Sequence, residues 1–148
     1  MRYDFIIIGG GMSGLVCAYI LSKEGKKVVV RKVSDREAVQ KHFTEDISEL
    51  LKQGLKPGQI VVLLNEAKSE SPLSELDKIG KIKFESIGGY YDERSRSIQF
   101  TNINMFKGLE ADVVFLFATD GHDSDELSEI LYVQGSRART LLYVYFLG

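Results

Sequence analysis

Short, uninterrupted apolar runs alternate with amphipathic stretches along this chain of 148 residues. Runs rich in β-branched residues are typical of buried parallel strands, and apolar spacings of three and four are typical of helices. The pattern predicts strands at residues 3–8, 27–30, 60–64, 82–86, 98–101, 113–118 and 141–146. It predicts helices at residues 12–23, 34–53, 71–78 and 123–137, and a polar loop at residues 88–97. This alternation predicts an α/β fold, a three-layer α/β/α, doubly wound and mostly parallel sheet in one domain, residues 1–148.

The second of these helices has the clearest sequence signals. Ser34 lies three residues before Glu37, which is the spacing of a capping box. Gly54 is expected to end the helix. The apolar residues between them recur at helical spacing and predict one buried stripe, made of Val39, Phe43, Ile47, Leu50 and Leu51.

Charge and composition exclude several classes of protein. Lys and Arg number 19 and Asp and Glu 21, for a net charge of -2, so we expect no nucleic-acid binding by the isolated chain. The single cysteine, Cys17, excludes an internal disulfide, and with His42 and His122 it is too little for a zinc site. No apolar run is long enough for a signal peptide or a membrane span, so we expect a cytoplasmic protein with no membrane partner. The oligomeric state stays open.

A glycine-rich loop follows the first predicted strand and precedes the first predicted helix. It fits G-x-G-x-x-G and consists of Gly9, Gly10, Gly11, Met12, Ser13 and Gly14. The glycines allow a tight turn, close approach of a pyrophosphate and close packing of helix on strand, while the helix N-terminus favours the anion. The loop is therefore a candidate dinucleotide site. The alternative is that these glycines only form a tight turn.

Residues 1–30 carry a closer likeness. The stretch Tyr3–Leu15, followed by Ala18-Tyr19 and residues 25–28, resembles the N-terminus of FAD-dependent amine oxidases. That resemblance implies FAD or NAD(P) as cofactor and an acidic residue at the end of the second strand for the adenosine ribose. Arg31 and Lys32 stand there instead. This basic pair could instead accept a ribose 2′-phosphate, and Lys32 is a candidate cofactor-binding residue.

Residues 28–148 resemble a different family, the second RecA-like domain of UvrD/Rep-type helicases. Residues 101–114 resemble the fifth motif of these helicases and residues 131–139 the sixth. The resemblance implies that Glu110 contacts a nucleotide sugar and that Arg137 reaches a γ-phosphate. It implies further nucleotide or nucleic-acid contacts for Thr101, Asn104, Lys107 and Gly108. The alternatives are that Arg137 stabilises a helix end and that Lys107 and Glu110 form a surface pair.

The chain contains no G-x-x-x-x-G-K-[ST] phosphate loop, which an ATP-driven motor needs. Both families use a parallel sheet, so strand–helix–strand pieces are exchangeable, and we infer a chimera, more readily engineered than natural. We expect no enzyme and no metal, only a scaffold with residual dinucleotide or phosphate binding at residues 9–14. The alternatives are an FAD- or NAD(P)-binding module and a nucleic-acid-interacting helicase fragment. The loops at residues 9–14 and 101–104 are expected to share one rim as a composite anion site.

Overall fold

The computed structural model describes residues 5–8, 27–33, 35–64, 66–102, 105, 110–119 and 138–147. The strands in this part of the chain are β1 (Phe5–Ile8), β2 (Lys27–Val33), β3 (Ile60–Leu64), β4 (Lys78–Ile79), β5 (Ile82–Ser86), β6 (Ile98–Asn102), β7 (Ala111–Thr119) and β8 (Ala138–Leu147). The helical elements are α2 (Arg36–Lys52) and the 3-10 turns η1 (Pro57–Gln59) and η2 (Lys68–Glu70). The helices predicted at residues 12–23 and 123–137 lie outside the described ranges.

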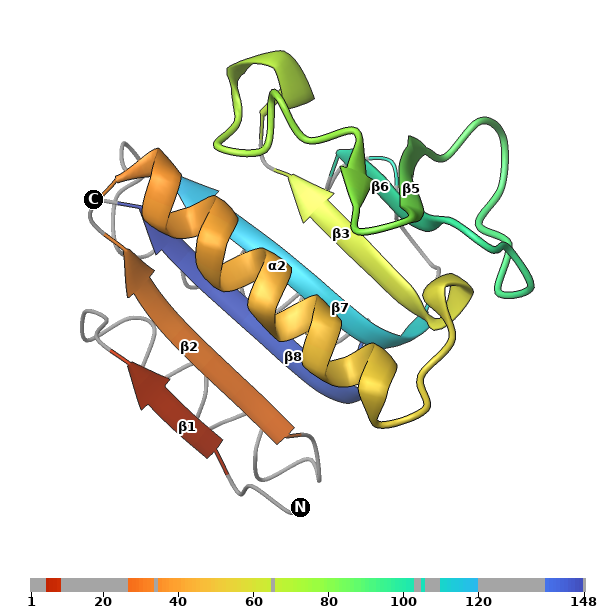
Figure 1. Ribbon diagram of the computed structural model, residues 1–148, viewed down its shortest axis with the longest axis horizontal. Coiled ribbons are helices and arrows are strands. Elements are labelled where there is room, and N and C mark those ends of the chain that lie inside the picture. Colours follow the sequence, from red (N-terminus) through yellow and green to blue (C-terminus); the bar gives the residue numbers. More distant parts are fainter. Residues whose placement is uncertain are drawn as a thin grey trace.

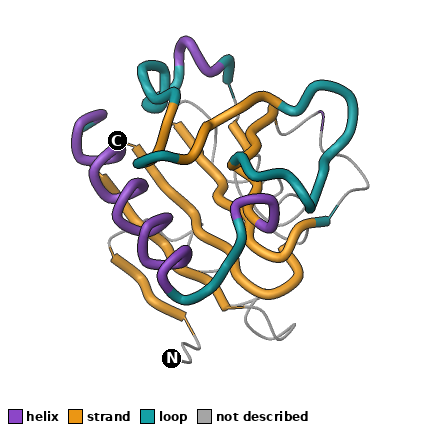
Figure 2. The backbone as a smooth tube through the Cα atoms, turned by 45° about the vertical axis from the view of Figure 1, so that its right-hand side comes forward, coloured by secondary structure: helices purple, strands orange, loops and turns teal. Residues whose placement is uncertain are grey.

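The described strands form one eight-stranded sheet in the order β1-β2-β8-β7-β3-β6-β5-β4. Every neighbouring pair is parallel except β4 and β5. Figure 1 shows the common strand direction, with α2 lying across β7 and β8. The predicted α/β fold with a mostly parallel sheet is confirmed. Figure 2 shows α2 along one face of the strands.

The order of the strands differs from that of a dinucleotide-binding domain. In that fold the glycine-loop strand is central, and the next two strands follow it outward to one edge. Here β1 lies at the edge of the described sheet with β2 as its neighbour, and β3 is separated from β2 by β8 and β7. The glycine-loop strand is therefore an addition to the side of the sheet.

The N-cap of helix α2 lies one residue later than predicted. Its N-cap is Asp35, whose carboxylate accepts a hydrogen bond from the Ala38 amide at 2.8 Å. The predicted capping box of Ser34 and Glu37 is therefore wrong, because an aspartate caps at least as well as a serine and lies next in the chain. Gly54 follows the helix with a φ of 100°, as a helix-terminating glycine does.

The helix predicted at residues 71–78 is also wrong. A 3-10 turn over Lys68–Glu70 comes first, and the chain then turns into the short strand β4. The Ser71 hydroxyl donates to the Lys68 carbonyl at 2.8 Å and accepts from the Leu73 amide at 3.2 Å. These two bonds give the backbone a turn in place of a helix. No helix in the described ranges is long and apolar enough to cross a membrane.

The core lies between α2 and the sheet. The predicted stripe of α2 is buried, with Leu51 only partly so. Phe43 lies at its centre and contacts aromatic rings of three strands edge-on or tilted, at centroid distances of 5.3 Å to Phe115, 5.4 Å to Phe117, 6.0 Å to Phe84 and 6.4 Å to Tyr145. Such pairs are each worth about 0.5–1.5 kcal/mol beyond the area that they bury.

A partly buried ion pair joins α2 to the sheet. Arg31 of β2 binds Asp46 of α2 with both nitrogens, Nε to Oδ2 at 2.6 Å and Nη2 to Oδ1 at 2.7 Å. The Tyr145 hydroxyl of β8 donates to the same carboxylate. Burial, with the Asp46 charge beside it, raises the pKa of Tyr145, so this hydroxyl keeps its proton and acts as the donor. The pair holds α2 against both β2 and β8.

Replacing Asp46 with alanine leaves the Arg31 charge half-buried without its partner. We expect Asp46→Ala to lower the free energy of unfolding by about 3–5 kcal/mol, measured by urea titration. The matched control is Glu45→Ala on the exposed side of the same helix, which is expected to change it by less than about 0.5 kcal/mol. Equal effects of the two changes would contradict the role of the pair.

Candidate functional site

The parallel strands bring their carboxyl ends to one edge of the sheet, which is where α/β folds bind ligands. We call this side the carboxyl edge, and it holds the ends of β1, β2, β8, β7, β3, β6 and β5. The opposite side, where these strands begin, is the amino edge. The candidate residues divide between the two edges.

The glycine loop, Gly9–Gly14, lies outside the described residues. The structure does describe β1, which precedes it in the sequence, and β2, the next described strand after it. Ile8, the last residue of β1, pairs with Arg31 of β2. Ile8 directly precedes the glycine loop in the sequence, so β1 ends beside Arg31, two residues before the end of β2. This is where a dinucleotide-binding fold places the residue that selects the adenosine ribose.

Arg31 is not available for a ligand at this place. Its guanidinium is held by the Asp46 carboxylate, and its side chain is only 18% exposed. Of the two basic residues expected to replace the missing acid, Arg31 therefore has a structural role. Lys32, the other basic residue, directly follows Arg31 in β2.

The strands that lead into the two loops of the expected composite anion site, β1 and β6, are not neighbours. Residues 9–14 follow β1 and residues 101–104 include the end of β6, so both segments do start from the carboxyl edge. Four strands, β2, β8, β7 and β3, lie between β1 and β6. Five strand spacings of about 4.8 Å separate these strands by about 24 Å, too far for one phosphate to bridge. Sharing an edge does not make two loops neighbours.

The two helicase-type residues that the structure describes, Thr101 and Glu110, lie at opposite edges of the sheet. Thr101 is half-buried in β6 beside Leu63, close to the carboxyl edge. Glu110 is exposed and directly precedes β7 at the amino edge, outside any helix. The next residue, Ala111, pairs with Ala138 of β8. The remaining predicted contacts lie outside the described residues, and they are Asn104, Lys107, Gly108 and Arg137.

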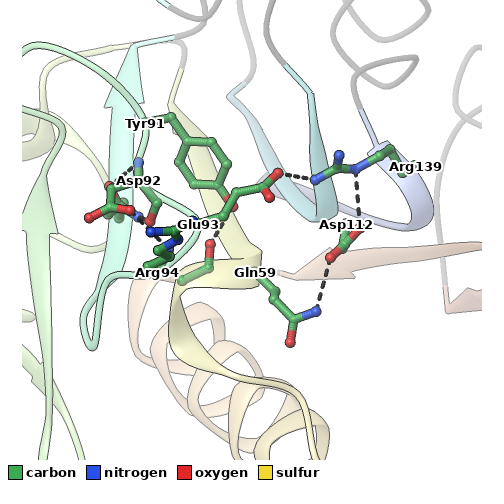
Figure 3. Close-up of polar contacts among 9 residues, drawn as sticks. Gln59, Tyr91, Asp92, Glu93, Arg94, Asp112 and Arg139 are labelled. Carbon is green, nitrogen blue, oxygen red and sulfur yellow. Dashed lines mark hydrogen bonds and ion pairs between the residues drawn. The ribbon is translucent and has the colours of Figure 1, made fainter.

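A polar network that was not predicted from the sequence lies at the amino edge (Figure 3). Arg139 of β8 pairs with Glu93 and, through Nε at 3.1 Å, with Asp112 of β7. Gln59 of η1 donates to the other oxygen of Asp112 at 2.9 Å. Arg139 and Asp112 belong to the two helicase-type motifs, but their partners are 46 and 53 positions away in the chain. Local patterns could not have indicated these pairs.

The same network anchors the polar loop at residues 88–97. The Tyr91 hydroxyl donates to the Gly58 carbonyl, and burial raises the pKa of Tyr91, so the donor proton is retained. Gly58 is buried, and a Cβ atom there would collide with the Glu93 carbonyl and lie 2.7 Å from that of Ser95. The loop therefore packs directly on the backbone of η1.

Glu66 is a further polar residue at the carboxyl edge, two positions after β3. Its Oε1 atom is buried and has no hydrogen-bond partner among the described residues. Burial raises the pKa of the Glu66 carboxyl, an effect that Arg36 opposes and Glu70 adds to. No metal-binding group of three or more His, Cys, Asp or Glu residues occurs in the described part of the chain.

Comparison with known proteins assigns both halves of the chain. Residues 4–86 match the pyridine nucleotide-disulphide oxidoreductase family, and the chain belongs to this family. Residues 97–145 match the UvrD-like helicase C-terminal domain. The two-part nature predicted from the sequence is confirmed. The oxidoreductase match extends to residue 86, beyond the junction that we expected near residue 30. Binding of FAD or NAD(P) is a trait of the oxidoreductase family.

Curated relatives are dehydrogenases. An anaerobic glycerol-3-phosphate dehydrogenase component from Actinobacillus pleuropneumoniae is 26% identical over 66% of this chain and 23% of its own length. The same component from Pectobacterium carotovorum is 33% identical over 55% of this chain and 16% of its own. A 4,4'-diapolycopen-4-al dehydrogenase from Metabacillus indicus is 29% identical over 74% and 24%.

The chain thus spans about a quarter or less of the length of these relatives. Our expectation that the chain is no enzyme is wrong. An oxidoreductase family model covers more than half of the chain, and the relatives named above are enzymes. The absence of a helicase phosphate loop argues against ATP-driven activity of the helicase-type part only, and it says nothing about the oxidoreductase part.

Gly58→Ala tests the contact between the polar loop and η1. We expect it to lower the free energy of unfolding by about 1–3 kcal/mol, because the new methyl group must displace backbone carbonyls. Gly88→Ala in the same loop is the matched control, since a Cβ there has nothing within 4 Å. Thermal and urea unfolding of both variants give the comparison. A Gly58→Ala protein as stable as the control would show that the loop is not packed as described.

Proposed function

We propose that this chain binds a pyridine dinucleotide at the carboxyl ends of β1 and β2, as the dinucleotide-binding part of an oxidoreductase. One observation carries the proposal. Ile8, the last residue before the glycine loop in the sequence, pairs in parallel with Arg31 near the end of β2, and adjacent parallel strands of this kind support the binding mode. The oxidoreductase match over residues 4–86 supports it.

The residues at the end of β2 favour NADP(H) over NAD(H) and FAD. A carboxylate at this place would accept hydrogen bonds from ribose hydroxyls, whereas a cation attracts a 2′-phosphate. Arg31 is engaged with Asp46, so Lys32 is the cation that we assign to the 2′-phosphate. The backbone amides of residues 9–14 would then hold the pyrophosphate.

The helicase-type part has a supporting role in this proposal. Strand β2 pairs with β8 along its whole length, from Lys27 with Leu141 to Val33 with Leu147. The binding segment is therefore carried by a strand of the other part. A bound pyridine dinucleotide supplies hydride transfer. We propose that the residues of this chain bind and orient the dinucleotide.

Titration with NADPH, NADH and FAD tests the proposal. We expect saturable binding of NADPH, followed by the change in its fluorescence. Gly11→Asp is expected to abolish NADPH binding, because the new carboxylate would occupy the space of the pyrophosphate and repel its negative charge. Gly89→Asp is the control, since it adds the same charge at an exposed glycine of the polar loop. Absence of binding to the unmodified protein, or equal binding by both variants, would refute the proposal.

The preference for NADPH is tested separately at Lys32. We expect Lys32→Glu to weaken NADPH binding at least tenfold, because a carboxylate there repels the 2′-phosphate, while NADH binding changes little or improves. Tenfold corresponds to about 1.4 kcal/mol. Lys27→Glu, the same charge reversal at the amino end of β2, is the control. If Lys32→Glu weakens the binding of NADPH and NADH equally, Lys32 does not bind the 2′-phosphate.

A further inference from the structure

The polar loop at residues 88–97 lies at the boundary between the two parts of the chain. The oxidoreductase match ends at residue 86 and the helicase match begins at residue 97, so almost all of the loop lies between them. The loop contacts residues of both parts at the amino edge (Figure 3). Its contacts therefore bear on how the two parts are held together.

Three successive residues hold the middle of the polar loop. The Tyr91 hydroxyl donates to a backbone carbonyl of η1, in the oxidoreductase-type part. Asp92 exchanges two hydrogen bonds with Gln99 of β6, from the Asp92 amide at 3.1 Å and from Gln99 Nε2 at 2.8 Å. The Glu93 carboxylate pairs with Arg139 of β8. The last two contacts bind the loop to the helicase-type part.

These contacts close into a ring. Arg139 also pairs with Asp112 of β7 at 3.1 Å, and Asp112 accepts a hydrogen bond from Gln59 of η1 at 2.9 Å. Gln59 directly follows Gly58, whose carbonyl binds the polar loop, so the path returns to the loop. Because contacts within one network are coupled, we expect that weakening one of them loosens the loop.

The ionic contacts of the ring are open to solvent. The side chains of Arg139 and Glu93 are 39% and 50% exposed, and that of Asp112 is 32% exposed. Dissolved ions screen charges at such positions, so these pairs weaken as the salt concentration rises. The strands beside them are held by apolar residues such as Val61 and Val114, which are fully buried and do not depend on charge. Salt should therefore release the loop before it affects the sheet.

We propose that Glu93, Arg139 and Asp112 form an ionic lock, which keeps the polar loop closed on the amino edge and releases it at high salt. The two parts of the chain stay joined when the lock opens, because β2 pairs with β8 and β3 pairs with β6 and β7. The lock does not rest on the proposed dinucleotide site, which is at the carboxyl edge.

Trypsin cleavage after Arg94 and Arg96 in the full chain measures the opening, because proteases cut a segment that opens locally. Initial rates are followed by mass spectrometry between about 0.01 M and about 1 M NaCl, over which the Debye length falls from about 30 Å to about 3 Å. Each rate is divided by that of trypsin on a small substrate at the same salt concentration. We expect the rate for the unmodified protein to rise about twofold to fivefold, the range for partly exposed ion pairs.

Three variants separate the lock from a general effect of charge. Glu93→Gln is expected to raise the rate at low salt by the same factor and to remove most of its salt dependence. Asp112→Asn should act in the same direction, because it breaks the ring at another contact. Glu85→Gln removes an exposed carboxylate of β5 close to the loop in the chain, and it is expected to behave as the unmodified protein does.

Several results would overturn the lock. They are a cleavage rate that does not change with salt, a salt dependence that persists in Glu93→Gln, and an equal effect of Glu85→Gln. Loss of the circular dichroism signal at the salt concentration that speeds cleavage would also overturn it, because the sheet would then unfold with the loop. An effect of Glu93→Gln without any effect of Asp112→Asn would contradict the ring. The salt series on the unmodified protein still tests the lock should urea unfolding show that a variant is unfolded.

Discussion

The ion pair between Arg31 and Asp46 constrains both the fold and the candidate site. It joins β2 to α2, and the Tyr145 hydroxyl extends it to β8. Removing either partner would leave a partly buried charge without its counter-ion, which is costly. The same contact takes Arg31 away from any ligand at the end of β2. The ion pair thus gives Arg31 a structural role.

The strand order decides how the two parts of the chain can coexist. The oxidoreductase match provides β1 to β5, and the helicase match provides β6, β7 and most of β8. These strands interleave, because β3 lies between β7 and β6, and β8 lies between β2 and β7. Parallel pairing therefore runs across every boundary between the parts. Without the other part, several strands of each part would lack the neighbours with which they form backbone hydrogen bonds.

The polar residues of the sheet have different roles at its two edges. At the amino edge, Arg139, Asp112 and Glu93 satisfy one another and tie the polar loop to the sheet. At the carboxyl edge, Glu66 retains an acceptor without a donor in the described structure. Buried polar residues that pair with one another stabilise the fold, because a buried group without a partner is costly. Family motifs and binding capacity thus need not coincide, because Asp112 and Arg139 lie in helicase-type motifs but serve packing.

Local pattern was sufficient for most elements and for the two-part nature of the chain. The run Ile60–Leu64 and the stripe around Phe43 were predicted residue by residue, because periodicity and flanking glycines act over a few positions. Ser34 and Ser71 were misread, since a competing cap or turn bond changes the outcome within the same few residues. Only the tertiary structure decided the place of β1 at the edge, the pairing of Arg31 with Asp46 and the burial of the Glu66 Oε1 atom. They depend on which distant strands become neighbours, and no local pattern contains that information.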